Sequence, residues 1–139
     1  EANDFAYIAA YSFNVEALFK MEVSILCALK FQFADIMTPL NFVERYIQFA
    51  AYPIRKKYRD RGTAKALKDG ETYCDLLGHL SLFFAELALF DCKIISTRKP
   101  SIIAAASLCF AVLSISLYPK WPEFLKDRTG YSYQDMQPI

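Results

Sequence analysis

The stretch PSIIAAASLCFAVLSISLY at residues 100–118 decides the fold, because no charged residue lies between Lys99 and Lys120. A helix without charge on any side is normally buried on every side. Pro100 suits the first turn of such a helix, and the many alanines and serines let neighbouring helices approach closely. The stretch therefore predicts the buried central helix of an all-α domain, at about residues 101–118.

A membrane span is the competing interpretation of this stretch. A helix needs about 20 predominantly apolar residues to cross a bilayer, and the stretch is nearly that long. Its four serines, its alanines and the absence of a basic flanking cluster favour burial within a protein. We therefore expect no membrane partner.

The composition describes a globular chain without a strong net charge. Its 139 residues are 55% hydrophobic, which is enough for one compact domain with an appendage. The 16 basic and 15 acidic side chains leave a net charge of +1, so we expect no nucleic-acid partner. The four cysteines show no CxxC spacing and fall mostly in apolar helical pattern. This usage predicts free thiols in a reducing, intracellular setting.

Helical periodicity continues on both sides of the central stretch. Asn14 and Thr38 stand in N-cap positions, Gly130 marks a C-terminal stop, and Ser132 has the capping-box spacing of a last helix. The other predicted helices cover residues 15–30, 40–50, 71–87 and 121–128. No segment alternates convincingly with period two, so no strand is expected.

The segment 52–70 differs from its surroundings, because it has many basic and few large apolar residues. It is predicted as a linker-like insertion, and the helix after it carries an apolar stripe of Tyr73, Leu76, Leu77, Leu80, Phe83, Phe84 and Leu87. A nuclear-import signal, a phosphate-binding patch or a solvated linker would each suit the basic residues Arg55, Lys56, Lys57, Arg59 and Arg61. Tyr58 is the only aromatic residue among them. A single aromatic ring offers little surface for stacking on nucleic-acid bases.

One carboxylate interrupts the apolar order of the helix at residues 15–30. Glu22 lies one turn from both Leu18 and Leu26, so its side chain emerges at the border of an apolar stripe. Covering that carboxylate without a cationic partner would be costly. Two interpretations stay open from the pattern: the carboxylate reaches sideways into water, or it meets a partner.

Candidates for catalysis are few. The single histidine, His79, could share a helical face with Asp75 and Glu86, but one imidazole is a thin basis for a metal site. The favoured interpretation of His79 is a partly buried structural histidine. A nucleophilic site that pairs Cys74 or Ser81 with His79 is not supported, because no oxyanion donors are recognised around it. There is no GxGxxG and no Walker loop. We therefore expect no catalytic residue, no metal, no cofactor and no enzymatic activity.

Several strings, taken in order, resemble the cyclins, the regulatory subunits of cyclin-dependent kinases, and most of all the mitotic A and B types. DFAYI at residues 4–8, LFKME at 18–22 and LKFQF at 29–33 resemble the end of the first cyclin box. LALFD at 87–91, PSIIAAA at 100–106 and the residues around Trp121 and Tyr131 resemble the second. The resemblance divides the chain into residues 1–36, from the first box, and 37–139, the second box with a basic insertion at about 52–70.

The resemblance implies a fold and a function. The fold is a five-helix box whose third helix is central, and the function is a non-catalytic subunit that binds and activates a cyclin-dependent Ser/Thr protein kinase in cell-cycle control. In this family a glutamate of the first box, paired with a lysine of an earlier helix, faces the kinase. Glu22 matches it, and Leu26, Phe31 and Phe33 match or adjoin apolar contact positions. The expected location is nucleus and cytoplasm.

One alternative to a kinase partner, and one expectation for the isolated segment, follow from the same residues. A cyclin-fold transcription-related adaptor or scaffold would act through protein contacts without a kinase, although the near-neutral charge argues against DNA binding. An exposed apolar stripe favours burial against another surface, and the helix at residues 15–30 carries one, formed by Leu18, Met21, Ile25 and Leu29. The isolated segment is therefore expected to self-associate through this helix, unless it is the ordered part of a longer subunit.

Overall fold

The protein is all-α in the computed structural model, which describes residues 2–33, 36–118 and 120–137. These residues form eight helices and no strand. The chain divides into two compact units, Glu1–Ile36 and Met37–Ile139, called unit 1 and unit 2 below. Unit 1 holds α1 (Ala2–Ile8) and α2 (Val15–Ala28). Unit 2 holds α3 (Pro39–Arg59), α4 (Ala64–Ala88), α5 (Cys92–Thr97), α6 (Pro100–Ser114), α7 (Glu123–Thr129) and α8 (Tyr133–Met136).

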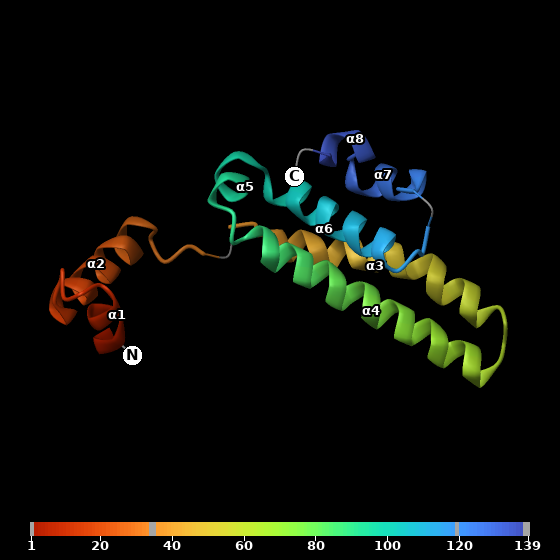
Figure 1. The fold of residues 1–139 in the computed structure, drawn as a ribbon, viewed down its shortest axis with the longest axis horizontal. Coiled ribbons are helices and arrows are strands. Elements are labelled where there is room, and N and C mark those ends of the chain that lie inside the picture. The colour runs from red at the N-terminus through yellow and green to blue at the C-terminus, as the bar shows by residue number, and fades with distance from the viewer. Residues whose placement is uncertain (1, 34–35, 119, 138–139) are drawn as a thin grey trace. The chain divides into compact units, whose positions relative to one another are not determined.

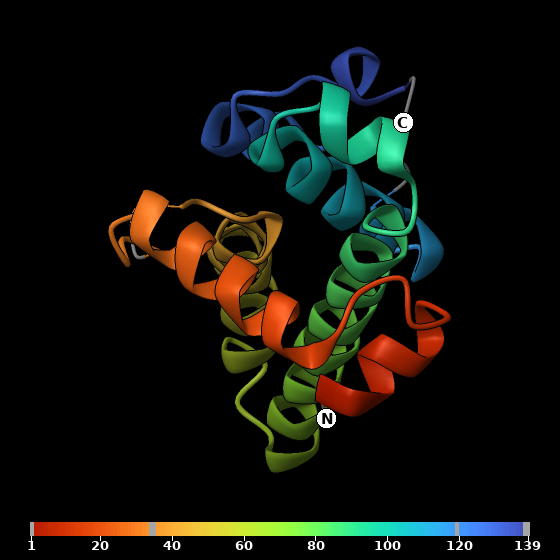
Figure 2. The same cartoon turned by 90° about the vertical axis from the view of Figure 1, so that its left-hand side faces the viewer.

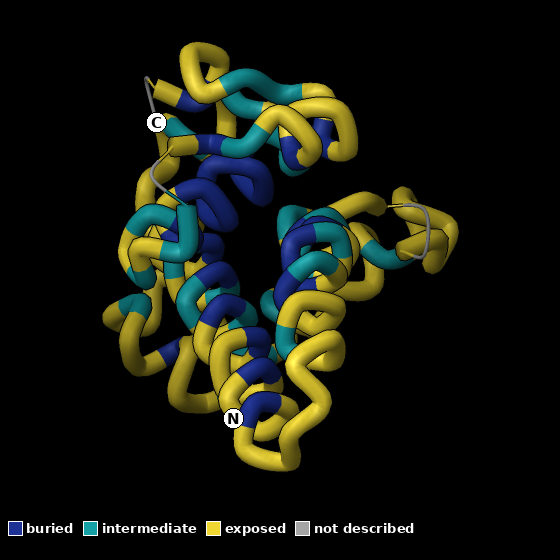
Figure 3. Tube along the Cα trace, turned by 90° about the vertical axis from the view of Figure 1, so that its right-hand side faces the viewer, coloured by how far each residue is buried: buried dark blue, intermediate teal, exposed yellow. Residues whose placement is uncertain are grey.

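Helix α6 is the central helix of unit 2, as its uncharged sequence predicts. It packs against α3, α4 and α8, and the buried residues gather along it and on the facing sides of α3 and α4 (Figures 1 and 3). Every residue from Ile103 to Cys109 is buried. The buried hydroxyl of Ser107 donates a hydrogen bond to the carbonyl oxygen of Ile103 at 2.8 Å. Small side chains and a satisfied serine therefore make the tight centre of the fold.

The central helix ends at Ser114, four residues earlier than predicted. Ser116 adopts a left-handed φ of 50°, and its amide donates to the Leu113 carbonyl while the Leu117 amide donates to Val112. This Schellman arrangement satisfies the last carbonyls of the helix and stops it, although Ser116 carries no glycine signal. Among the described residues, no helix combines the length and the apolarity needed to span a membrane.

The segment 52–70 is not a linker, and that prediction is wrong. Helix α3 continues to Arg59 and α4 begins at Ala64, so the two helices form a hairpin (Figure 1). Buried Ile54 continues the inner face of α3 beyond Pro53, and Ala66 and Gly70 begin that of α4. The basic residues Lys56, Lys57 and Arg59 lie in the last turn of α3, where cations are favourable.

Helix α4 buries a different face from the apolar stripe noted in its sequence. Its buried residues are mostly small and comprise Ala66, Gly70, Cys74, Leu77, Ser81 and Ala85. Of the stripe only Leu77 is buried, whereas Leu76 and Phe83 are 44% and 56% exposed. Small residues face the core because α4 packs closely against both α3 and α6, which leaves no room for larger side chains between them.

Gly70 marks the closest approach within the hairpin and gives a test of it. A Cβ atom at Gly70 would lie 2.8 Å from the Cβ of Tyr58, which is fixed to the α3 backbone. We expect Gly70→Ala to lower the free energy of unfolding by about 1 to 3 kcal/mol through overpacking, despite the better helix propensity of alanine.

Gly78 of the same helix is the matched control, since a Cβ there meets nothing within 4 Å. Gly78→Ala should raise stability by about 1 kcal/mol through helix propensity. Thermal unfolding followed by circular dichroism compares the two variants. Equal stabilisation by both substitutions would contradict the close approach of α3 and α4.

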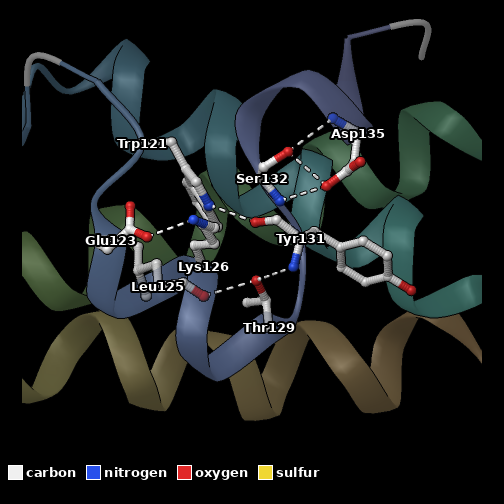
Figure 4. Close-up of polar contacts among 8 residues, drawn as sticks. All are labelled: Trp121, Glu123, Leu125, Lys126, Thr129, Tyr131, Ser132 and Asp135. Atoms are coloured by element: carbon white, nitrogen blue, oxygen red, sulfur yellow. Dashed lines mark hydrogen bonds and ion pairs between the residues drawn. The ribbon is translucent and has the colours of Figure 1, made fainter.

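A polar network closes unit 2 at its C-terminal helices (Figure 4). The indole Nε1 of Trp121 donates to the carbonyl of Tyr131 at 3.0 Å, and the hydroxyls of Tyr131 and Ser101 lie 2.7 Å apart. Gly130 ends α7 in a left-handed conformation with φ 78°, and Ser132 caps α8 with Asp135 in a capping box. Both sequence signals are confirmed, and the network ties α7 and α8 to the start of α6.

Candidate functional site: an apolar groove with one carboxylate

The candidate site lies within unit 1, whose two helices are joined by a turn (Figure 2). Asn14 caps α2 as predicted, because its side chain accepts a hydrogen bond from the Ala17 amide at 2.7 Å. The helix ends in a Schellman arrangement, in which the amides of Lys30 and Phe31 donate to Cys27 and Leu26. Lys30 and Phe31 both have left-handed φ values, of 51° and 54°. This turn determines the direction in which the chain leaves α2.

An apolar groove of about 520 Å³ lies between α1 and α2, and we call it the α1–α2 groove. Its lining consists of Ala2, Phe5, Leu18, Phe19, Met21, Glu22, Ile25, Leu26 and Phe33. Among the described residues of that lining, Glu22 is the only charged one. No residue of α2 is buried, so the apolar wall of the groove is available for contact.

Three of the four predicted kinase-contact residues line the α1–α2 groove. Glu22, Leu26 and Phe33 all line the groove, whereas Phe31 lies outside its lining and is 64% exposed. No described cation forms an ion pair with the Glu22 carboxylate, although the nearby Glu16 pairs with Lys20 at 2.8 Å. A carboxylate at the edge of an apolar surface can orient a partner that brings a cation. The kinase-binding role of these four residues stays a prediction.

The α1 wall of the groove was not predicted from the sequence. No helix was predicted before residue 15, but Ala2–Ile8 is helical and Ala6 is buried. Ala2, Phe5 and Ala6 follow the i, i+3, i+4 spacing of one helical face. That signal covers barely two turns, which is too short to predict an isolated helix.

The basic residues Arg55, Lys56, Lys57, Arg59 and Arg61 lie at the far end of the α3–α4 hairpin and are all exposed. They belong to unit 2 and form no part of the α1–α2 groove. Arg61 lies over the ring of Tyr58 at 4.9 Å from its centroid. Their role as an import signal or a phosphate patch stays a prediction.

The catalytic candidates do not form a site. His79 is exposed, which corrects its prediction as partly buried, while Cys74 and Ser81 point into the core. The Ser81 hydroxyl donates to the Leu77 carbonyl at 2.7 Å, so it is not available to His79. Burial raises the pKa of the Cys109 thiol to about 11, which keeps it protonated at neutral pH. Among the described residues, no cluster of three His, Cys, Asp or Glu side chains could hold a metal.

Comparison with known proteins identifies the family to which unit 2 is similar. The family model described as "Cyclin, C-terminal domain" matches residues 37–139, which is most of the chain. The chain belongs to the cyclin family. This confirms the resemblance drawn from the sequence, and the all-α cyclin box around α6 is confirmed with it.

The relatives of this cyclin are A and B types. It is 30% identical over 137 residues to Cyclin-B1-4 of Arabidopsis thaliana, which covers 98% of this chain and 30% of the relative. It is 31% identical over 142 residues to G2/mitotic-specific cyclin-B2 of Rana japonica, covering 100% of this chain and 29% of that one. Cyclin-A1 of Homo sapiens is 27% identical over 138 residues, which cover 99% of this chain and 25% of the relative.

These names agree with the expected link to the cell cycle and mitosis. The chain spans only between a quarter and a third of the length of these relatives. The comparison with solved structures found no match.

Proposed function

We propose that this cyclin is a non-catalytic regulatory subunit that binds and activates a cyclin-dependent Ser/Thr protein kinase in cell-cycle control. Under this proposal unit 1 is the final helix and exit of the first cyclin box, and unit 2 is the second box. The α1–α2 groove contacts the kinase through Leu26 and Phe33, and Glu22 supplies its charged contact. Phe31 adds an apolar contact beside the groove.

The observation that carries the proposal is the Glu22 carboxylate on a groove whose other described lining residues are apolar. Apolar surface of this kind is typical of a protein interface, where an exposed charge fixes the orientation of the partner. Glu22 has no ion-pair partner among the described residues of this chain, so a cation from another protein can reach it. Membership of the cyclin family supports a kinase as that protein.

A capture experiment tests the proposal. The intact protein is used to retain partners from extract, the retained kinase is identified, and its activity on a Ser/Thr substrate is measured with and without the cyclin. We expect one cyclin-dependent kinase to be retained and its activity to rise on binding. Retention of partners without any kinase would instead identify an adaptor or scaffold, and a retained kinase without stimulation would remove the activating role.

We also propose that the protein is found in nucleus and cytoplasm, where a cell-cycle kinase acts. Imaging of a fluorescent fusion checks this location. Confinement to any other compartment would contradict it.

A further inference from the structure

The end of the α3–α4 hairpin is a concentrated positive surface that the proposed kinase role does not use. Seven of the 16 basic side chains of the chain lie within residues 55–68, where Asp60 is the only acid. The rest of the chain therefore carries nine basic and 14 acidic side chains, so the positive charge is local. We call this set the basic tip, and it comprises Arg55, Lys56, Lys57, Arg59, Arg61, Lys65 and Lys68.

The basic tip is not neutralised by the protein itself. All seven side chains are exposed, and none forms an ion pair with a carboxylate of the described residues. Arg55 donates to the Gln48 side chain at 3.4 Å, and Arg61 lies over Tyr58, but these contacts leave their charges in place. Closely spaced like charges repel one another, so an anionic partner would relieve that repulsion.

The tip is held on a rigid support. Tyr58 packs against Tyr73 across the hairpin with ring centroids 5.9 Å apart, and Gly70 allows the two helices to approach at the same level. Thr63 caps α4 by accepting from the Ala66 amide at 3.1 Å. Helix ends fixed in this way present the charges without a large loss of backbone entropy on binding. In Figure 1 the end of the hairpin projects past α6, so a partner can reach it.

A groove beside the tip adds an apolar contact. It has a volume of about 500 Å³ and is lined by Tyr58, Arg61, Asp69, Thr72, Tyr73 and Leu76. The exposed edge of Tyr73 and the side chain of Leu76 can receive one bulky apolar side chain, while Arg61 at the same site favours an acidic neighbour. Asp69 is the single acid there, and it would repel a ligand that is anionic throughout.

Nucleic acid is the less suitable polyanion for this surface. Base stacking needs open aromatic faces, but Tyr58 is already engaged by Arg61 and Tyr73. The charge of the remaining chain is negative overall, which would repel a long phosphate backbone beyond the tip. A short acidic segment can bind the basic tip without extending over the negatively charged remainder of the protein.

We propose that the basic tip docks an acidic segment of a partner protein and that one bulky apolar side chain of this segment enters the groove beside Tyr73 and Leu76. The proposal rests on the hairpin alone and is independent of kinase binding through the α1–α2 groove. The two proposals can therefore fail separately.

Binding of a labelled peptide to the full chain tests this docking surface. The probe is a glutamate peptide of about nine residues with one central phenylalanine, followed by fluorescence anisotropy at about 0.15 M salt. We expect saturable binding that weakens as salt rises. Replacing the phenylalanine of the peptide with alanine should weaken binding by about tenfold, because the groove then loses its apolar contact.

Two double variants locate the site. Lys56→Glu with Lys57→Glu should weaken binding by about tenfold or more. Lys65→Gln with Lys68→Gln should weaken it by about fivefold, and this pair controls for folding because removing cations near the N-terminus of α4 favours the helix. Lys93→Glu with Lys120→Glu, exposed and outside the tip, is the charge-matched control and should leave affinity within about twofold.

Three results would overturn the proposal. They are the absence of saturable binding, an equal loss of affinity in the Lys93 and Lys120 variant, and tighter binding of a single-stranded DNA oligonucleotide that displaces the peptide. The last result would identify a nucleic-acid surface instead.

Discussion

Ala105→Asp is expected to abolish the folded state of unit 2. Ala105 is 0% exposed in the centre of α6, where its neighbours Ala104 and Ala106 are also buried. An aspartate there would carry a charge into a tightly packed apolar site without a cation to pair with, at a cost of more than about 3 kcal/mol. A domain of this size has a stability of only about 5 to 15 kcal/mol. Ser107→Arg, at another buried position, should act in the same way.

Circular dichroism and thermal unfolding measure this effect. Ser114→Asp is the matched control, because Ser114 lies on the same helix but is exposed. An acid in the last turn opposes the helix dipole, so the control should lose only about 0.3 to 1 kcal/mol. α6 would not be the buried centre of the fold if the Ala105→Asp protein were soluble and folded and had the same unfolding temperature as the Ser114→Asp control.

If Glu22 contacts the kinase as proposed, Glu22→Ala should weaken kinase binding by about 2 to 5 kcal/mol in the intact protein, because the substitution removes one member of a charge pair at a desolvated interface. Stability should hardly change. Glu22 is exposed and unpaired among the described residues, and alanine is a good helix former. Affinity measured by calorimetry against the purified kinase, with an unfolding curve for each variant, separates the two effects.

Glu16→Ala provides the control on the same helix. Glu16 is also an exposed glutamate, but it pairs with Lys20 and does not line the α1–α2 groove. Its loss should change kinase affinity by less than about 0.5 kcal/mol. Equal affinities for the Glu16 and Glu22 variants, with normal unfolding, would refute the role of Glu22.

Local chemistry allowed several features to be predicted before the structure. Asn14 and Ser132 cap helices and Gly130 ends one, because each depends on a few neighbouring residues. The position of α6 followed from the absence of charge along a whole helix, which leaves no side that prefers water. The border position of Glu22 likewise depended only on its spacing from Leu18 and Leu26.

Features decided by neighbours in space could not be predicted in the same way. The basic composition of residues 52–70 indicated a linker, yet buried Ile54 and the close contact of Tyr58 with Gly70 extend both helices through it. Charges on the outer side of a helix do not oppose its formation when the inner side is packed.

The orientation of α4 and the composition of the α1–α2 groove show most clearly which features depend on the local sequence and which depend on tertiary packing. Periodicity alone identified α4 as a helix with a large apolar stripe, but two close neighbours, α3 and α6, selected its small residues for the core. In unit 1 the sequence placed Glu22 and Leu26 on one helix, and only the packing of α1 brought Phe5 beside them. Helix periodicity and caps depend on residues a few positions apart, whereas the face that is buried depends on the volume left between helices from distant parts of the chain.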